Sequence, residues 1–364
     1  MIEEEEMGKK YITLKGLTLP ELKEYFVSSG EPKFRAEQVF KWIYGDLVDN
    51  FNEMKNIPKA LREKLDASYE LDTLNYVTSE TSVSTKTKKY ILQTKDGHRI
   101  ESVVIPEQKR TTLCISTQVG CPLDCKFCAT GLMGYKKNLS AGEIFDQFKF
   151  TKKDYTESEI TNIVYMGMGE PLLNFDATVS SLKIFREELT NGINLKKITV
   201  STAGIPHKIN ELAETGLKVK LALSLHSCFE DIRSKIMPIN KKYSLAKNIE
   251  AIKNYSIKTG TKTTFEYVML DGINDRKEDL KALVNLCSTL PSKVNIIPFN
   301  SLEHMKPGGF AATLKPSPKD TIKVFTDKLR EKNITVVLRN TQGDDIAAAC
   351  GQLAIKIQKA NFKS

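Results

Sequence analysis

The sequence predicts an α/β fold in which about six strand-helix units form either an open sheet or an incomplete barrel. Three observations indicate this. Short apolar runs rich in β-branched residues alternate with amphipathic stretches from about residue 110 to 300. Strand-like segments joined by a tight turn precede them, and the first seventy or so residues have helical periodicity. About six units are too few for a closed eight-fold barrel.

The N-terminal region is expected to be a compact helical unit. The stretch LTLPELKEYFVSSG begins at a Thr-Leu-Pro cap, and KFRAEQVFKWIYG carries apolar residues at helical spacing up to a glycine. The second stretch holds the only tryptophan, Trp42, beside Lys33, Arg35 and Lys41. The indole belongs either to the core of this unit or to a face that touches nucleic acid.

The next segments, LNYVTSETSVSTKTKKYILQT and HRIESVVIPE, are separated by the turn KDG and predict a β-hairpin. The repeated units follow, with TNIVYMGMGE, KKITVST, KVKLALSLHS, TTFEYVML and KVNIIPFN as the strand-like runs. Sites in such folds lie at the carboxyl ends of the strands. We therefore expect function in GMGEP, STAG, SLHS, PFNS and the loop of cysteines that precedes them.

Composition narrows the class of protein. The chain has 364 residues, 40% of them hydrophobic, and a net charge of +9 from 54 basic and 45 acidic residues. This charge favours a polyanionic partner or is an ordinary basic surface. No apolar run is long enough for a membrane helix, and MIEEEEMGKK is too acidic for a signal or transit peptide. Seven cysteines, an odd number clustered in one tract, favour metal or catalytic thiols in a reducing, cytoplasmic setting.

The tract TTLCISTQVGCPLDCKFCAT places Cys114, Cys121, Cys125 and Cys128 within fifteen residues. The last three have the spacing C-x3-C-x2-C, whereas a structural zinc site needs four protein ligands. Three thiolates suit an iron-sulfur cubane whose fourth iron stays open to a small ligand. The alternatives are three ordinary buried cysteines or an incomplete zinc knuckle.

The motifs CPLDCKFC and GMGEP resemble those of the radical S-adenosylmethionine (SAM) enzymes. Together with TLCISTQVGCPLDCKFCATG, YMGMGEPLLN, LALSLHS and GDDIAAACGQLA, in this order over nearly the whole chain, they resemble the RlmN/Cfr family of radical SAM RNA methyltransferases. The resemblance implies a partial (β/α)6 radical SAM barrel. It also implies four parts: an RNA-binding helical domain (1–75), a β-hairpin linker (76–109), the barrel (110–300) and a C-terminal segment with a relay cysteine (301–364).

The resemblance also implies cofactors and their contacts. A [4Fe-4S] cluster would be held by Cys121, Cys125 and Cys128, and two SAM molecules would be used in each turnover. The residues implied for the SAM site are Gly169, Glu170, Ser201, Ser224, Leu225, His226 and Asn300. From the sequence alone, Glu170 suits the ammonium group of SAM, whereas a lone histidine such as His226 is more often structural.

Cys350 and Cys114 acquire roles only through the resemblance, since a free cysteine is often inert. C2 of adenine is not nucleophilic, so direct displacement of a SAM methyl group cannot work there. In the family, one SAM methylates Cys350, a radical from the second SAM activates that methyl group, and the carbon bonds to C2. Cys114 then releases the base by forming a disulfide with Cys350. Glu101 matches the family's proton acceptor, although such glutamates are more often solvated.

The implied substrates are an adenosine of 23S rRNA near the peptidyl-transferase centre and the adenosine 3′ of the anticodon in tRNA. A flavodoxin or ferredoxin would supply electrons to a monomeric enzyme. A flipped adenosine needs a basic surface to hold its phosphates. Candidate lysines are Lys86, Lys88, Lys89, Lys136, Lys137, Lys241, Lys242, Lys253, Lys258 and Lys262.

Three alternatives remain open. The first is a Cfr-type enzyme that methylates adenine at C8 and confers antibiotic resistance, although GMGEPLLN looks like the C2 type. The second is another radical SAM class, such as a glycyl-radical activase, which needs neither Cys114 nor Cys350. The third is a zinc-stabilised RNA-binding protein without catalysis. Cys228 and Cys287 match nothing catalytic and are expected to fill the core.

Overall fold

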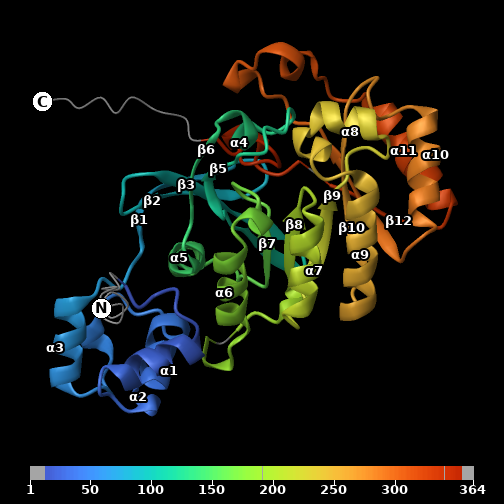
Figure 1. Ribbon diagram of the computed structural model, residues 1–364. Coiled ribbons are helices and arrows are strands. Elements are labelled where there is room, and N and C mark those ends of the chain that lie inside the picture. Colours follow the sequence, from blue (N-terminus) through green and yellow to red (C-terminus); the bar gives the residue numbers. More distant parts are fainter. Residues whose placement is uncertain (1–12, 191, 340, 355–364) are drawn as a thin grey trace, which may run out of the picture.

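The computed structural model describes residues 13–190, 192–339 and 341–354. The described residues form one sheet of ten strands in the order β1-β2-β3-β4-β7-β8-β9-β10-β11-β12, and a separate pair, β5-β6. Helices α6, α7 and α9 lie side by side along one face of the strands (Figure 1). The predicted α/β class is therefore confirmed.

Six neighbouring parallel strands form the incomplete barrel and confirm the expected number of units. The strands are β4 (Arg110–Cys114), β7 (Asn162–Tyr165), β8 (Ile198–Thr202), β9 (Lys220–Ser224), β10 (Thr263–Met269) and β11 (Ser292–Pro298). The helices between them are α4 (Ala129–Leu132), α5 (Ala141–Asp154), α6 (Phe175–Arg186), α7 (Pro206–Glu214), α8 (Glu230–Ile236), α9 (Leu245–Thr259) and α10 (Lys277–Cys287). The short pair β5 (Gln118–Gly120) and β6 (Tyr135–Asn138) flanks the cysteine loop.

One more unit extends the parallel sheet beyond the prediction. Helix α11 (Lys319–Glu331) leads into β12 (Thr335–Leu338), which pairs in parallel with β11. This strand is only four residues long, and three of the four are exposed or nearly so. Its pattern therefore lacks the buried apolar run by which the other parallel strands were identified.

The expected hairpin is part of a longer antiparallel arm. Strands β1 (Leu74–Thr81), β2 (Lys88–Thr94) and β3 (Arg99–Glu107) pair antiparallel in sequence, and β3 continues onto β4. The segment predicted as one strand divides at residues 82–87, where Ser82 N–H donates to Thr87 O at 2.8 Å and Thr85 N–H to Ser82 Oγ at 3.0 Å. Short polar side chains that bond to nearby backbone favour turns, and the β-favouring residues around them concealed this signal.

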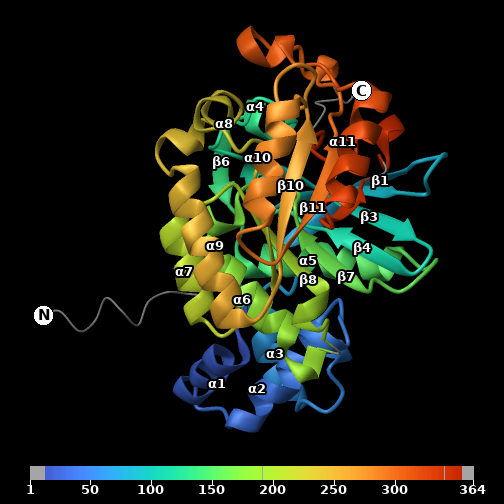
Figure 2. The ribbon, with the colours of Figure 1, turned by 90° about the vertical axis from the view of Figure 1, so that its right-hand side faces the viewer.

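The N-terminal helices form a unit at one end of the molecule (Figure 2). Helix α1 (Leu19–Ser28) begins after Thr18, whose N–H donates to Glu21 Oε2 at 2.7 Å. Helix α2 (Lys33–Phe40) continues as a π-helical turn over Lys41–Gly45. Helix α3 spans Lys59–Ser68. Trp42 packs partly against the core, and its Nε1 donates to Asn56 Oδ1 at 2.6 Å. It also lines a shallow hollow with Phe34 and Lys41, so both interpretations of the indole remain open.

Buried ion pairs join this unit to α5. Lys15 Nζ lies 2.6 Å from Asp146 Oδ1 and 2.8 Å from Asp72 Oδ1, and the side chains of Lys15 and Asp146 are fully buried. Asp146 Oδ2 also accepts hydrogen bonds at 2.6 Å from both the N–H and the hydroxyl of Thr73. Lys149 Nζ completes the cluster at 2.6 Å from Asp72. These contacts fix the position of the helical unit relative to the barrel.

Asp146→Ala should strongly destabilise the protein. It leaves the Lys15 ammonium buried with one partner fewer and removes the acceptor of the Thr73 bonds, a change that costs about 3–5 kcal/mol of unfolding free energy. Thermal unfolding followed by circular dichroism measures the effect. Glu211→Ala is the matched control, because Glu211 pairs with Lys208 on the surface and such pairs contribute about 0–1 kcal/mol. Equal unfolding temperatures for the two variants would contradict this account.

Candidate active site

The cysteine loop lies at the carboxyl end of the barrel, between β5 and α4. Gly120 turns the chain into this loop with φ +72°, and a Cβ there would lie 1.8 Å from Gly134 O. Lys126 N–H donates to Ile236 O at 2.9 Å, which attaches the loop to α8. Cys121, Cys125 and Cys128 all line one open cavity. We call this the first cavity.

The three thiols fit an iron-sulfur cluster better than a single ion. Burial raises the pKa of Cys121 to about 12 and the pKa values of Cys125 and Cys128 above their usual range. Their thiolates therefore need a cation to offset the lost hydration. In the described residues no three His, Cys, Asp or Glu side chains come close enough together to hold one metal ion. A cubane binds each thiolate through a different iron, so its ligands need not meet at one point.

Residues from the ends of four other strands line the first cavity opposite the cysteines. The residues predicted for SAM that lie there are Gly169, Glu170, Ser201, Ser224, His226 and Asn300. Leu225 is fully buried and is not among the described lining residues. The structure therefore brings together all but one of the side chains that the sequence predicted for this site.

Glu170 is held in place by backbone donors. Its Oε1 accepts from Leu172 N–H at 3.0 Å and its Oε2 from Ala203 N–H at 2.7 Å. Burial raises the pKa of this carboxyl, although the backbone hydrogen bonds oppose the rise. A buried carboxylate on the cavity wall is well placed for the ammonium group of an amino acid.

His226 combines a structural role with a place in the cavity wall. Its backbone has φ +56°, its Nδ1 accepts from Val268 N–H at 3.0 Å, and its ring lies edge-on to Phe127 with centroids 4.5 Å apart. Burial, with the nearby charge of Arg233, lowers the pKa of His226 to about 3. The imidazole is therefore neutral, and because Nδ1 accepts, the proton lies on Nε2. This agrees with the expectation of a satisfied histidine.

Gly169→Ala should weaken SAM binding by at least tenfold. Gly169 has φ +101°, and a Cβ there would lie 2.6 Å from Gln118 Cβ and 2.8 Å from Gln118 N. Gln118 Oε1 in turn accepts from Glu170 N–H at 2.8 Å, so the collision displaces the carboxylate. Equilibrium dialysis with labelled SAM measures the effect. Gly216→Ala is the control, since Gly216 has φ +71° but nothing within 4 Å. If both variants bind SAM like the wild type, Gly169 is not needed for the site.

A second cavity adjoins the first and contains the two cysteines among the remaining catalytic candidates. Cys114, at the end of β4, and Cys350 line it together with Arg339, and Cys350 also lines the first cavity. Asn300 Nδ2 donates to Cys350 O at 3.0 Å, and Ala129 N–H, next to Cys128, donates to Gly351 O at 2.7 Å. Cys350 is thus fixed to both the last barrel strand and the cysteine loop.

Both thiols are protonated at neutral pH. Burial, with the charge of Cys350, raises the pKa of Cys114 to about 12. Cys350 is exposed, but desolvation by the cavity walls around its thiol, with the charge of Glu266, raises its pKa to about 11. The charge of Arg339 opposes both rises. All seven cysteines are free, so the disulfide implied between Cys114 and Cys350 is not seen.

Glu101 lies near this site but not on the wall of either cavity as the described residues define them. It is buried on β3, with Oε1 3.8 Å from Lys89 Nζ. Lys89 Nζ also donates to Ile346 O, in the turn before Cys350. Glu101 and Lys89 therefore support the segment that carries Cys350.

Three charged residues of the site were missed from the sequence. Glu266 lines both cavities from the middle of β10 and accepts from Asn295 Nδ2 at 2.7 Å. Arg339 follows β12, and Arg233 is fully buried on α8. A single carboxylate within the apolar run TTFEYVML was a usable signal, because buried charges are rare. No comparable sequence signal indicated that Arg233 and Arg339 belong to the site.

The remaining cysteines behave as expected. Cys228 and Cys287 are partly buried, pack against the core, and are not among the described residues that line the first and second cavities. Core filler stays our interpretation for both.

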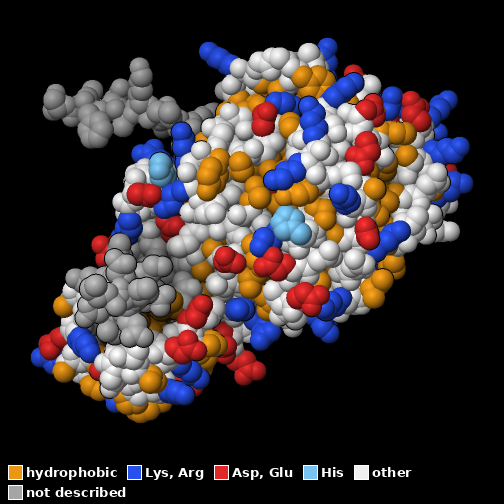
Figure 3. All heavy atoms as spheres, viewed as in Figure 1, with side chains coloured by type: hydrophobic (Ala, Val, Ile, Leu, Met, Phe, Trp, Pro, Cys, Tyr) orange, Lys and Arg blue, Asp and Glu red, His pale blue; other side chains and the backbone are white. Residues whose placement is uncertain are grey.

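The predicted lysine surface needs correction. Lys89 is buried and cannot hold RNA from outside. Lys88 pairs with Asp154 at 2.6 Å and Lys137 with Asp96 at 3.0 Å, so their charges are partly neutralised. On the face seen in Figure 3, basic side chains are mixed with acidic ones. On this face, charge therefore does not single out an RNA-binding surface.

Two stretches of the chain match known families. Residues 12–71 match the family described as ribosomal RNA large subunit methyltransferase N-terminal domain, and residues 115–287 match the Radical SAM superfamily. With the incomplete barrel and the three-cysteine cavity, these matches define a radical SAM enzyme, whose cofactors are a [4Fe-4S] cluster and SAM.

Relatives identify the family more closely. The chain is 43% identical to the probable dual-specificity RNA methyltransferase RlmN of Dictyoglomus turgidum, over 92% of this chain and 94% of the relative. It is 41% identical to the dual-specificity RNA methyltransferase RlmN of Pseudomonas putida, over 97% and 92%. The crystal structure of a radical SAM methyltransferase from Sphaerobacter thermophilus matches with a TM-score of 0.87 and 39% identity, over 94% of this chain and 99% of that one. The chain belongs to the RlmN family of radical SAM RNA methyltransferases.

Proposed function

We propose that this enzyme methylates C2 of adenosine in 23S rRNA and tRNA through a methyl group carried on Cys350. One observation carries the proposal: Cys350 lies on the shared wall of the two cavities. A carbon attached to its Sγ can be reached from the side of the cluster cysteines and from the side of Cys114. The relatives named dual-specificity RNA methyltransferases support the two kinds of RNA.

In this proposal Cys121, Cys125 and Cys128 hold the cluster. Gly169, Glu170, Ser201, Ser224, Leu225, His226 and Asn300 form the SAM site, Leu225 through its backbone. When bound, the cluster and SAM supply a carbon radical able to abstract a hydrogen atom from a methyl group. The neutral His226 and the apolar side chains on the wall of the first cavity would offer few protons to this chemistry.

The relay residues then act in sequence. Cys350 Sγ loses its proton and accepts a methyl group from SAM. After activation, the carbon on Cys350 bonds to C2 of adenine. The adduct then gives up one electron, which the bound cluster would take back, and its C2 proton, for which Glu101 is the proposed acceptor. Cys114 Sγ, after losing its proton, attacks Cys350 Sγ, so that a sulfur-sulfur bond forms and the carbon-sulfur bond breaks. The released carbon takes up a proton to become the methyl group, and the methylated base leaves. An external reductant restores the two thiols.

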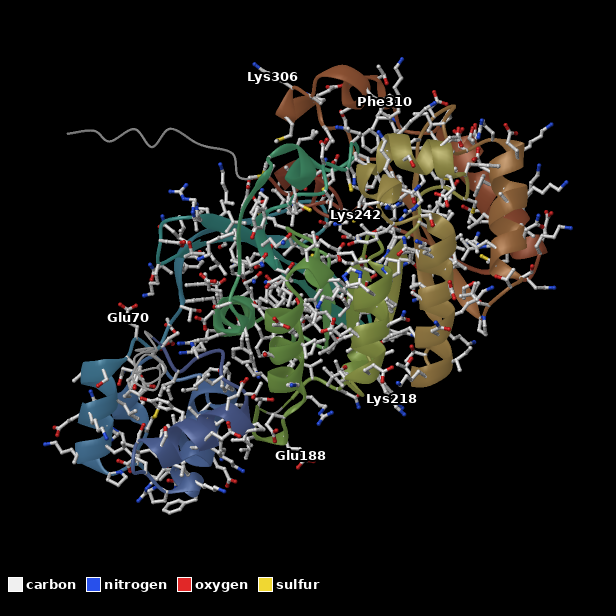
Figure 4. The ribbon with its side chains drawn as sticks, viewed as in Figure 1. Glu70, Glu188, Lys218, Lys242, Lys306 and Phe310 are labelled. Carbon is white, nitrogen blue, oxygen red and sulfur yellow. The ribbon has the colours of Figure 1, made fainter. Side chains whose placement is uncertain are left out.

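The rest of the chain would serve RNA binding. We assign residues 1–75 to an RNA-binding domain, 76–109 to the connecting strands, 110–300 to the barrel and 301–364 to the relay segment. Exposed Lys306 and Phe310 lie on the segment beyond β11 (Figure 4), where a base could stack near a phosphate-binding cation. None of the helices in the described residues has the length and apolar character needed to span a bilayer. A cytoplasmic monomer, reduced by a flavodoxin or ferredoxin, completes the proposal.

The test combines cofactor and product analysis. The protein is purified without oxygen, its iron and sulfide are measured, and it is incubated with SAM, a reductant and unmodified 23S rRNA or tRNA. Mass spectrometry of the digested RNA should show 2-methyladenosine, and the triple Cys121, Cys125 and Cys128→Ala variant should show neither cluster nor product. 8-Methyladenosine would indicate the C8 type instead. A colourless wild-type protein that contains zinc would overturn the enzymatic proposal.

A further inference from the structure

Arg233 is a buried cation that no carboxylate of the described residues contacts directly; the charge of Glu230 reaches it only across Asn240. Its side chain is fully inaccessible to solvent and belongs to α8, which lies behind the first cavity. Burial lowers its pKa to about 10, so it still carries its charge at neutral pH. Buried charges are usually paired, because an unpaired one loses its hydration without compensation. In the described residues no carboxylate forms an ion pair with this guanidinium.

All the acceptors around Arg233 are neutral. Its Nη2 donates to Ala203 O at 2.6 Å and to Ser224 O at 3.0 Å, and its Nε donates to Leu225 O at 3.1 Å. Its Nη1 donates to Asn240 Oδ1. Arg233 thus ties together the carboxyl ends of β8 and β9, where Ala203 N–H also holds the Glu170 carboxylate.

The same helix is attached to the cysteine loop. Lys126 N–H donates to Ile236 O at 2.9 Å, and Ile236 and Met237 pack in one buried cluster with Cys121. Ala203 and Ser224, whose carbonyls accept hydrogen bonds from Arg233, line the first cavity together with Cys121, Cys125 and Cys128. The cation therefore lies behind the wall of the cavity that three thiolates would share.

We propose that Arg233 is the buried counter-charge of the iron-sulfur cluster, and that its charge favours the reduced cluster while its hydrogen bonds hold the ends of β8 and β9. The inference rests on the proposed function, because it needs the cluster at Cys121, Cys125 and Cys128. Reduction adds one electron to a cluster already made negative by three thiolates. A fixed cation in a poorly hydrated site stabilises that added charge.

A charge swap tests this without removing the arginine. Asn240 Nδ2 donates to Glu230 Oε2 at 2.6 Å, while Asn240 Oδ1 faces Arg233. The double variant Glu230→Gln/Asn240→Asp keeps both side-chain shapes, the net charge and a hydrogen bond between the two residues. It moves the carboxylate onto the atom that Arg233 contacts. The cation is then paired and its effect on the cluster falls.

The readout is the cluster's reduction potential, measured by electron paramagnetic resonance during redox titration of the full-length protein. For the swap and for Arg233→Gln we expect the equilibrium to move at least tenfold against reduction, which is about 59 mV for one electron. Arg330→Gln is the control, because Arg330 is exposed on α11 and pairs with Asp327. The swap retains the native hydrogen-bond acceptors of Arg233. If Arg233→Gln does not fold, the reduction potential of the swap variant alone tests the inference.

Wild-type potentials in the swap and in Arg233→Gln, at unchanged iron and sulfide content, would overturn the inference. If the wild-type protein itself binds no cluster, the proposed function fails and the inference with it. A lower potential in the variants with a normal control supports Arg233 as the counter-charge. A loss of SAM affinity without a change in reduction potential would refute the effect of the Arg233 charge on the cluster. It would leave only the role of Arg233 in holding the ends of β8 and β9.

Discussion

Cys350→Ala is expected to retain the iron-sulfur cluster and SAM binding but to lose RNA methylation by a factor on the order of 10³ or more, as when an enzyme loses its nucleophile. The cluster should persist because Cys350 is not one of the three cysteines of the loop. Methylation should fail because the sulfur that carries the methyl group is missing. Anaerobic iron analysis, SAM dialysis and mass spectrometry of the RNA give the three measurements.

The control for Cys350→Ala is Cys287→Ala. Cys287 is a half-buried cysteine that is not among the described residues lining either cavity, so its loss should leave all three measurements near wild type. Residue 350 precedes Gly351, whose carbonyl accepts a hydrogen bond from Ala129 N–H. This backbone bond does not need the thiol, so Cys350→Ala should retain it. RNA methylated at the wild-type rate by Cys350→Ala would show that no methyl relay passes through this residue.

The parts of the site that could be predicted share a local signal. Cys121, Cys125 and Cys128 are close in sequence, and Glu170 follows an apolar strand in a glycine-rich turn. Parallel strands bring their carboxyl ends to one edge, so residues such as Ser201 and Ser224 meet although many residues separate them. For these residues, the fold class together with position along a strand was enough to place them in one cavity.

The parts that could not be predicted depend on contacts between distant segments. Arg233 lies in an ordinary amphipathic stretch, and only the packing of α8 under β8 and β9 buries it. The sequence pattern makes Lys89 look like a surface lysine of an alternating strand, yet the C-terminal segment covers it and Ile346 O accepts a hydrogen bond from its Nζ. Likewise, Cys350 and Cys114 are brought to one cavity by a segment whose path no local pattern specifies.

The same difference separates two buried glutamates near Cys350. Glu101 was predicted through the resemblance, and the structure places it against Lys89, beneath the relay segment. Glu266 was not predicted, and it lines both cavities beside Cys350. A carboxylate inside an apolar strand of a barrel is therefore a stronger local signal for a site than one near a strand end.

Cys114→Ala is expected to accumulate enzyme that is covalently bound to RNA. Residue 114 has no part in loading the methyl group on Cys350, in activating it or in bonding it to the base, so these steps should proceed. Release alone should fail, because no other described cysteine lines the second cavity to attack Cys350 Sγ. The purified variant should carry nucleotide on Cys350, seen as a protein band shifted under denaturing conditions and collapsed by nuclease.

The position of Cys114 makes this outcome specific. It ends β4, seven residues before the cluster loop, and it shares the second cavity with Cys350, whereas Cys228 does not. Cys228→Ala should therefore release its product normally and serves as the matched control. The double variant Cys114→Ala/Cys350→Ala should carry no RNA, because the tether needs Cys350. If Cys114→Ala contains a full cluster and a methylated Cys350 but no bound nucleotide, residue 114 acts before the tether forms, and its assignment as the resolving thiol is wrong.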